Sequence, residues 1–234
     1  MFRFKRFNVS QDLCAMKVGT DGVLLGAWAE GGTHILDIGT GTGLIALMMA
    51  QRFPQARITA IDIDRGACLQ AQRNIEESPY AGQINVLEKS IQNYTEKAIS
   101  ENTLFDCIVC NPPFFINSLK APDCQRSLAR HADTLPHSQL LRCVKLLLAS
   151  NGTFSCILPT EQTVPFLTEA TLLGLSTTRR TDIKTTPAKA PKRTLLELRQ
   201  GFQPKTATET VVLQTAEGNR STWYEMLTSD FYLF

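Results

Sequence analysis

The sequence lacks an apolar run long enough to span a membrane, and its amino terminus lacks an apolar segment of signal-peptide length. It also lacks internal repeats and low-complexity tracts, which argues against a solenoid or a disordered chain. Its 234 residues, 43% hydrophobic and 20% charged, have the composition of an ordinary globular protein. We therefore expect a cytoplasmic, monomeric protein with a single domain over residues 1–234.

The patterns of a disulfide framework or a metal site are missing as well. The seven cysteines are an odd number spread through expected strands and helices. Cys107 and Cys110 have the spacing of half a zinc site, but no second pair of cysteines or histidines supplies the other ligands. We therefore expect reduced thiols packed in the core and no bound metal.

Net charge is only +2, but its distribution along the chain is uneven. Residues 179–205 carry eight basic and two acidic side chains, a local net charge of +6. A second basic cluster, Arg3, Lys5 and Arg6, alternates with phenylalanines at the amino terminus. Alone, each cluster is typical of a solvated face. Beside a nucleic-acid site, each would supply phosphate contacts.

Strand and helix patterns alternate through the first three quarters of the chain. Strands are expected at 33–38, 57–61, 84–87, 105–110 and 153–158, and helices at 44–52, 65–77, 91–99, 137–149 and 161–173. This order predicts an α/β fold with a mostly parallel sheet and helices on both faces. After Gly174, β-rich stretches at 176–186 and 194–202 predict antiparallel strands at one sheet edge, with 210–214 as a further candidate. Residues 116–136 are expected to form a long loop.

Glycines at 39, 41 and 43 stand where the first strand of this pattern gives way to a helix. There they let the backbone approach a nucleotide-like ligand closely, although a tight connection would use them too. The spacing G-x-G-x-G differs from the G-x-G-x-x-G of dinucleotide enzymes. The G-x-G-x-x-G loop of those enzymes binds the pyrophosphate of the dinucleotide, which S-adenosylmethionine lacks. We therefore expect S-adenosylmethionine as the cofactor, with Asp37 holding its ammonium group. The alternative role for Asp37 is a strand-end cap.

Two further positions extend this expected cofactor site. Asp62 ends the next strand and is placed to accept hydrogen bonds from ribose hydroxyls, while Asp64 is expected to cap the following helix. Ser90, just after the third strand, would reach the adenine of the cofactor.

Asn111, Pro112, Pro113 and Phe114 follow the fourth strand directly, at the carboxyl edge where parallel sheets build their sites. An exocyclic amine on a heteroaromatic ring is a poor nucleophile, because its lone pair is delocalised. The Asn111 side-chain carbonyl and the Pro112 backbone carbonyl could each accept a hydrogen bond from this amine. Phe114 would stack on a base taken out of its nucleic-acid structure, and Asn111 would also border the cofactor.

The order of these motifs resembles that of the class I amino-methyltransferases over residues 19–173. Four further stretches, 16–22, 127–131, 190–193 and 230–233, resemble a narrower family. Its members are the tRNA adenine-N6 methyltransferases that modify the adenine 3′ of the anticodon in a valine tRNA. The resemblance implies a Rossmann-like fold with a seven-stranded sheet whose last strand is antiparallel.

The same resemblance implies a division of the chain and further site residues. Residues 1–30 would form a basic segment that covers the cofactor, 31–174 the Rossmann-like core, and 175–234 the antiparallel strands and the carboxyl-terminal segment. Additional cofactor contacts would come from Lys17, Thr20 and Asp21, and tRNA contacts from Arg130, His131, Lys192 and Arg193.

Other functions share part of this pattern. A methyltransferase acting on N2 of an rRNA guanine, or on N5 of a protein glutamine, would carry the same motifs. Basic clusters near both ends favour RNA over a protein substrate. An NAD-linked oxidoreductase would need a different glycine spacing, and a non-catalytic RNA-binding protein would not need Asn111.

Overall fold

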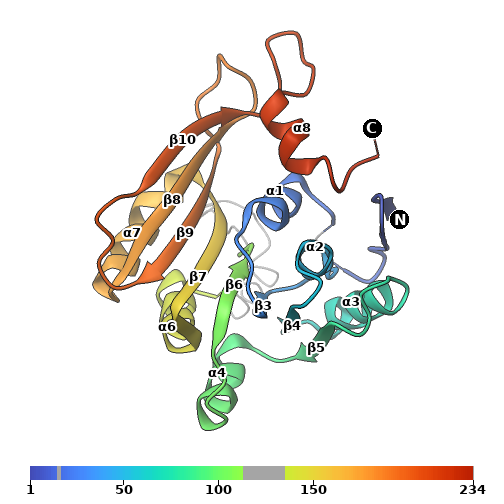
Figure 1. Cartoon of the computed structure of the whole chain (residues 1–234), viewed down its shortest axis with the longest axis vertical. Coiled ribbons are helices and arrows are strands. Elements are labelled where there is room, and N and C mark those ends of the chain that lie inside the picture. Colours follow the sequence, from blue (N-terminus) through green and yellow to red (C-terminus); the bar gives the residue numbers. More distant parts are fainter. Residues whose placement is uncertain (15–16, 113–134, 234) are drawn as a thin grey trace, which may run out of the picture.

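The computed structural model describes residues 1–14, 17–112 and 135–233. The strands of its large sheet are β3 (His34–Ile38), β4 (Arg57–Asp62), β5 (Ile84–Glu88), β6 (Phe105–Cys110), β7 (Leu148–Pro159), β8 (Leu175–Lys184), β9 (Arg193–Gln200) and β10 (Ala207–Val212). They lie side by side in the order β10-β8-β9-β7-β6-β3-β4-β5 (Figure 1). The predicted α/β fold with a mostly parallel sheet is confirmed.

Strand direction agrees with the prediction except at one edge. Strands β3 to β9 make up the expected seven, and β9 runs antiparallel to both of its neighbours, β7 and β8. The sheet of the described residues has eight strands, one more than the seven expected, because β10 pairs in parallel with β8. This pairing satisfies backbone groups that β8 would otherwise expose at the sheet edge.

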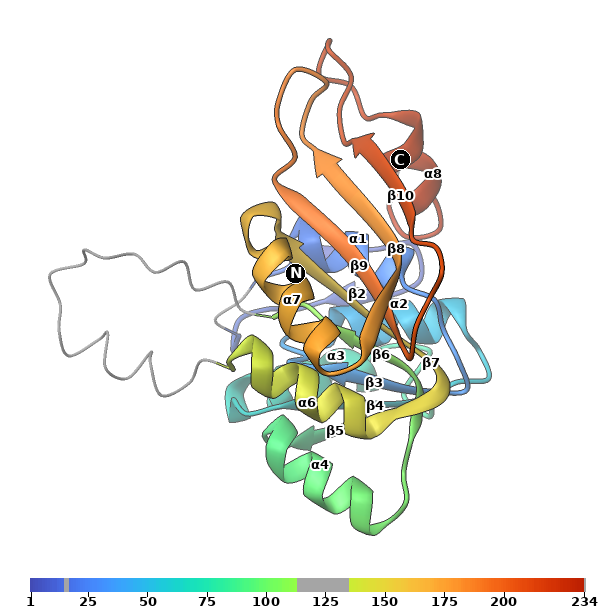
Figure 2. The same ribbon diagram turned by 90° about the vertical axis from the view of Figure 1, so that its left-hand side faces the viewer.

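Helices cover both faces of the sheet (Figure 2). Their bounds are α1 (Thr20–Trp28), α2 (Leu44–Arg52), α3 (Arg65–Glu76), α4 (Ile91–Ser100), α6 (His137–Leu147), α7 (Thr163–Leu172) and α8 (Thr222–Thr228). A 3-10 turn, Thr160–Gln162, precedes α7. Helices α1, α2 and α3 pack on one face, while α4, α6 and α7 pack on the other. None of these described helices has both the length and the apolar character needed to cross a bilayer.

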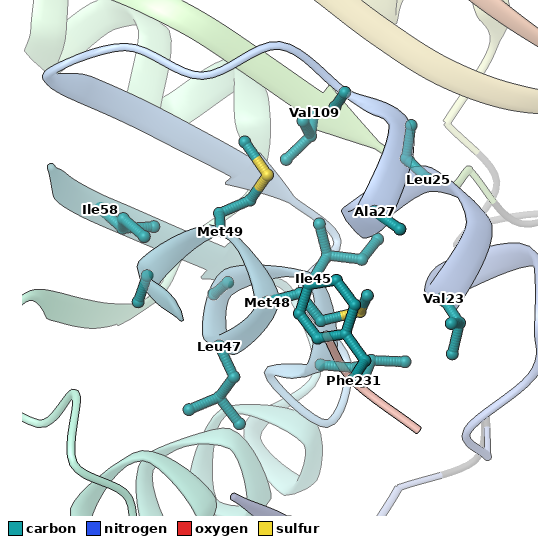
Figure 3. Close-up of a cluster of buried hydrophobic side chains, with 14 of the residues drawn as sticks. Val23, Leu25, Ala27, Ile45, Leu47, Met48, Met49, Ile58, Val109 and Phe231 are labelled. Atoms are coloured by element: carbon teal, nitrogen blue, oxygen red, sulfur yellow. The ribbon is translucent and has the colours of Figure 1, made fainter. Parts of the chain in front are cut away.

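Helix α1 is the main element that the sequence pattern does not predict. Seven of its nine residues are buried, so it has no polar face to give a helical period. Two of its glycines face α2. A Cβ on Gly22 would lie 3.1 Å from Leu44, and one on Gly26 would lie 2.8 Å from the sulfur of Met48. Figure 3 shows Met48 and its buried neighbours beside α1. The two helices therefore pack closely because these positions have no side chain.

A short hairpin at the amino terminus was not predicted either. Strands β1 (Phe2–Arg3) and β2 (Asn8–Val9) pair antiparallel, and the rings of Phe4 and Phe7 stack with centroids 4.8 Å apart. The backbone N–H of Lys5 donates to the carbonyl of Phe231 at 2.8 Å. The two ends of the described chain therefore lie together (Figure 1).

Replacing Gly26 by valine should lower the free energy of unfolding by roughly 1–3 kcal/mol, because the new side chain would overlap Met48. Urea unfolding of the purified protein measures this change. Gly82→Val is the control, since no atom lies within 4 Å of a Cβ there, and its effect should stay within about 0.5 kcal/mol. Equal stability of the two variants would contradict the close packing of α1 on α2.

Candidate functional site

The predicted site residues meet at the carboxyl edge of the three central strands. Ile38 of β3 is in register with Ile61 of β4 on one side and with Cys110 of β6 on the other. The strand ends are therefore level with one another. Asp37, Asp62 and Asn111 come together here because each lies at or beside the end of one of these strands.

The glycine-rich loop between β3 and α2 turns sharply at all three predicted glycines. Gly39, Gly41 and Gly43 have φ angles of +70°, +56° and +81°, in the left-handed region that other residues rarely adopt. Among the described residues, no atom lies within 4 Å of a Cβ placed on Gly39, whereas one on Gly43 would lie 3.3 Å from Ala71 of α3. The loop therefore leaves open space at Gly39 and packs tightly at Gly43.

Asp37 is fully buried at the end of β3. The hydroxyl of Thr40 donates to its Oδ2 at 2.7 Å, while its Oδ1 has no hydrogen-bond partner in the part of the chain that the structure describes. Burial raises the pKa of this carboxyl group to about 7, and the bond from Thr40 offsets only part of that rise. Sequence reasoning missed Thr40, although a hydroxyl three residues after a carboxylate is a visible signal.

Asp62 supports the loop as well as facing the site. The backbone N–H of Gly41 donates to its Oδ2 at 2.9 Å, and that of Asp64 donates to its Oδ1 at 3.0 Å. Burial raises the pKa of Asp62. Asp64 caps α3, as predicted, by accepting a hydrogen bond from Gly66 N–H at 2.7 Å. Asp62 thus ties the end of β4 to the glycine-rich loop.

Asn111 and Pro112 directly follow β6, as the sequence predicts. Pro112 is buried, and the Asn111 Oδ1 atom is buried with no hydrogen-bond partner among the residues described. A buried carbonyl oxygen without a partner is costly unless a ligand supplies the donor. Phe114, the predicted stacking ring, lies outside the described residues.

The remaining predicted cofactor residues lie around this edge in different ways. Ser90 follows β5, and its hydroxyl caps α4 by accepting a hydrogen bond from Asn93 N–H at 3.2 Å. Lys17 and Thr20 are exposed, on the stretch that leads into α1. Asp21, the second residue of α1, has its side chain engaged with a distant residue, Arg193.

Asp21 forms an ion pair with Arg193, whose Nε lies 2.7 Å from the Asp21 Oδ2. The two residues were predicted to have separate roles, one toward the cofactor and the other toward RNA. Arg193 begins β9 opposite Pro159, the last residue of β7, so it lies at the same carboxyl edge as the site. Lys192, next to it, is exposed. Arg130 and His131 lie outside the described residues.

The basic segment 179–205 carries less available charge than its composition indicates. Four of its arginines make ion pairs with acidic side chains, among them Glu30 and Asp21 from outside the segment. The pairs are Arg179 with Glu30 and Glu197, Arg180 with Asp182, Arg193 with Asp21, and Arg199 with Glu30 and Glu197. Lys189 and Lys192 are exposed in the connection between β8 and β9.

The two cysteines with the spacing of half a zinc site are part of the hydrophobic core. Cys107 and Cys110 are buried in β6, and burial raises the pKa of Cys107 to about 12, so its thiol stays protonated. Within residues 1–14, 17–112 and 135–233, no three side chains of His, Cys, Asp or Glu are grouped to hold a metal ion.

Replacing Gly43 by alanine should destabilise the fold more than replacing Gly39. Both changes force alanine into the left-handed region, at about 1–2 kcal/mol each. Only Gly43→Ala also pushes a methyl group against the Ala71 backbone. Thermal unfolding of both variants tests this order. A Gly39 variant as unstable as the Gly43 variant would show that the loop is not open at Gly39.

Comparison with known proteins agrees with this geometry. Residues 18–144 match the model of the methyltransferase small domain. Among solved structures, a predicted O-methyltransferase from Agrobacterium tumefaciens superposes with a TM-score of 0.69 at 18% identity, over 90% of this chain and 96% of that chain. A ribosomal protein L11 methylase from Lactobacillus delbrueckii gives 0.52 at 15% identity, over 77% of each chain. At these identities, both show the fold alone.

Curated relatives align over nearly the whole chain. A protein from Parabacteroides distasonis is 48% identical over 99% of this chain and 97% of its own length. One from Porphyromonas gingivalis is 44% identical over 99% and 94%, and one from Trichodesmium erythraeum is 42% identical over 99% and 97%. All three are named tRNA1(Val) (adenine(37)-N6)-methyltransferase. The chain therefore belongs to this methyltransferase family, as its motifs indicated.

Proposed function

We propose that this protein transfers a methyl group from S-adenosylmethionine to the exocyclic N6 of the adenine immediately 3′ of the anticodon in a valine tRNA. The observation that carries this proposal is a pair of buried oxygens without partners among the described residues, Asp37 Oδ1 and Asn111 Oδ1. Asp37 lies in β3 and Asn111 directly follows β6, and these neighbouring strands are level at the carboxyl edge. The site thus presents two acceptors where a cofactor and a substrate would each bring donors.

The residues around Asp37 fit S-adenosylmethionine. A carboxylate without a partner on one oxygen suits the ammonium group of the cofactor, because the charge pair would offset the cost of burying the carboxylate. The open space at Gly39 lets a ligand approach the backbone. The remaining cofactor residues of the proposal are Lys17, Thr20, Asp21, Gly41, Gly43, Asp62 and Ser90. When bound, the cofactor supplies an electrophilic methyl group.

Asn111 and Pro112 would hold the adenine amine. Its two N–H groups can donate to the Asn111 side-chain carbonyl and the Pro112 backbone carbonyl, which directs the nitrogen lone pair away from them. Pro112 restricts the backbone here, so the two acceptors are positioned before the base arrives. Phe114 would stack on the base. No general base is needed for this step, because the methylated amine is acidic enough to lose its proton to water.

The RNA substrate is supported by the names of the relatives and by the position of Lys192 and Arg193. These residues stand at the carboxyl edge, where the connection between β8 and β9 ends, and are proposed to contact tRNA phosphates together with Arg130 and His131. A guanine or glutamine amide would fit the same two acceptors. The relatives named as adenine-N6 methyltransferases favour adenine.

Binding of S-adenosylmethionine should release protons from Asp37 near neutral pH. Its pKa of about 7 means that the free protein holds a proton there below pH 7, and a neighbouring ammonium group would favour the ionised form. Release should therefore approach one proton at pH 6 and decrease as the pH rises through about 7. Calorimetry in buffers of different ionisation enthalpy measures it.

The matched variant is Asp37→Asn, which should bind the cofactor more weakly and release no proton. Wild-type binding without proton release at pH 6 would show that the ammonium group does not lie at Asp37.

Asn111→Ala should reduce methyl transfer to unmodified valine tRNA by about 10²–10³-fold, by loss of an oriented acceptor. Affinity for S-adenosylmethionine should change little. Labelled methyl groups should appear as N6-methyladenine after digestion of tRNA treated with the wild type. Asn85→Ala, on the exposed face of β5, should keep full activity. The proposal fails if the product is N2-methylguanine, if only protein is labelled, or if the Asn111 variant stays active.

A further inference from the structure

Two buried side-chain amides on α3 have no place in the function proposed so far. Gln70 and Asn74 are each 2% exposed, one helical turn apart on the face that packs toward the glycine-rich loop. Burying a primary amide is costly unless its donors and acceptors are satisfied. The hydrogen-bond partners of these amides therefore indicate their structural role.

Those partners lie on a stretch near the amino terminus, Ser10–Cys14, which we call the strap. Asn74 accepts a hydrogen bond from Ser10 N–H at 2.9 Å and donates to the Ser10 carbonyl at 2.8 Å. Gln70 accepts a hydrogen bond from Leu13 N–H at 3.0 Å. The two amides thus bind the strap backbone as a neighbouring strand would.

Asn74 also holds the glycine-rich loop. Its Nδ2 donates to the carbonyl of Thr42 at 2.8 Å, in addition to its bond to Ser10. One side chain therefore joins the strap to the loop that follows β3. These two segments are 32 residues apart in sequence and are fixed relative to each other by this amide.

The strap in turn borders the space above the loop. Among the described residues, the atom nearest to a Cβ placed on Gly41 is the sulfur of Cys14, at 3.8 Å. At the start of α3, a Cβ on Gly66 would lie 2.9 Å from the Leu13 carbonyl. Within the strap, the side chain of Gln11 accepts a hydrogen bond from Val18 N–H at 2.8 Å, close to the start of α1.

We propose that Asn74 is a positioning residue for cofactor binding. By holding Ser10 and Thr42 together, it fixes the spacing between the strap and the glycine-rich loop, and the strap forms one wall of the cofactor site. Gln70 supports the same arrangement through Leu13. The inference rests on the proposed binding of S-adenosylmethionine at this loop.

The test compares variants of the full chain by calorimetric titration with S-adenosylmethionine. Asn74→Leu keeps the approximate size of the side chain but removes its three strong bonds, and should raise the dissociation constant about tenfold. Gln70→Leu removes one strap bond and should raise it about threefold. Turnover at saturating cofactor should stay within about twofold of wild type, because the groups that hold the base are unchanged. Gln72→Ala is the control, since Gln72 is exposed on α3 and bonds to Glu76.

A second readout does not depend on activity. Cys14 is half-buried, and its alkylation by N-ethylmaleimide can be followed by peptide mass spectrometry. S-adenosylmethionine should slow this reaction in the wild type. In Asn74→Leu, alkylation without cofactor should be several-fold faster, and Gln72→Ala should react as the wild type does.

Three outcomes would overturn the proposal. The first is that affinity and Cys14 alkylation match the control in both variants, and the second is that cofactor affinity falls only in proportion to the folded fraction seen by circular dichroism. The third is that turnover and the Michaelis constants for cofactor and tRNA all change together, which general destabilisation would also cause. If Asn74→Leu does not fold, the affinity and Cys14 alkylation of Gln70→Leu test the proposal. A wild type that fails to bind S-adenosylmethionine would refute the proposed cofactor, whereas normal wild-type binding with unaffected variants would refute the role of Asn74 alone.

Discussion

The parallel pairing of β3 with β4 on one side and β6 on the other determines where the polar groups of the site lie. Parallel strands point their carboxyl ends the same way, so three segments far apart in sequence end at one level. Buried apolar residues fill both faces of these strands, and a shift of register would expose them. The placement of Asp37, Asp62 and Asn111 is therefore stabilised by the core rather than by contacts within the site.

The stability of that core also offsets the free-energy cost of burying two side-chain oxygens in the site. Among the described residues, Asp37 Oδ1 and Asn111 Oδ1 have no hydrogen-bond partner, so their burial opposes folding, and burial raises the pKa of Asp37 to about 7. The surrounding strands and α2 are almost completely buried, so they hold these groups in place. The site is thus prepared for ligands with donors at the expense of some stability of the free protein.

Sequence reasoning succeeded where local pattern and final structure agree. The helix at Leu44–Arg52, the strand at Phe105–Cys110 and the cap at Asp64 were predicted at their observed positions, because period, glycine punctuation and capping are local signals. Helix α1 was missed because burial on all sides removes the period. Strand β10 was expected only as a further candidate at 210–214, because its residues are mostly exposed and give no clear strand pattern.

The pairing of charged groups was beyond local pattern. Asp21 and Arg193 are 172 residues apart, and no spacing rule connects them. The net charge of residues 179–205 likewise could not show that Glu30 neutralises part of it. Charge counts describe a segment, whereas the available charge depends on which acidic residues the fold brings beside it.

The hydrogen bond between Lys5 and Phe231 has a consequence for synthesis on the ribosome. The strap that borders the proposed cofactor space follows the hairpin, and the hairpin packs against the chain around Phe231, a segment made much later, with Phe4 stacked on Tyr232. The central strands and their helices can associate earlier, as the chain emerges. The hairpin reaches its final packing only once the segment around Phe231 has left the exit tunnel, so a nascent chain can form the central strands before the proposed cofactor site is complete.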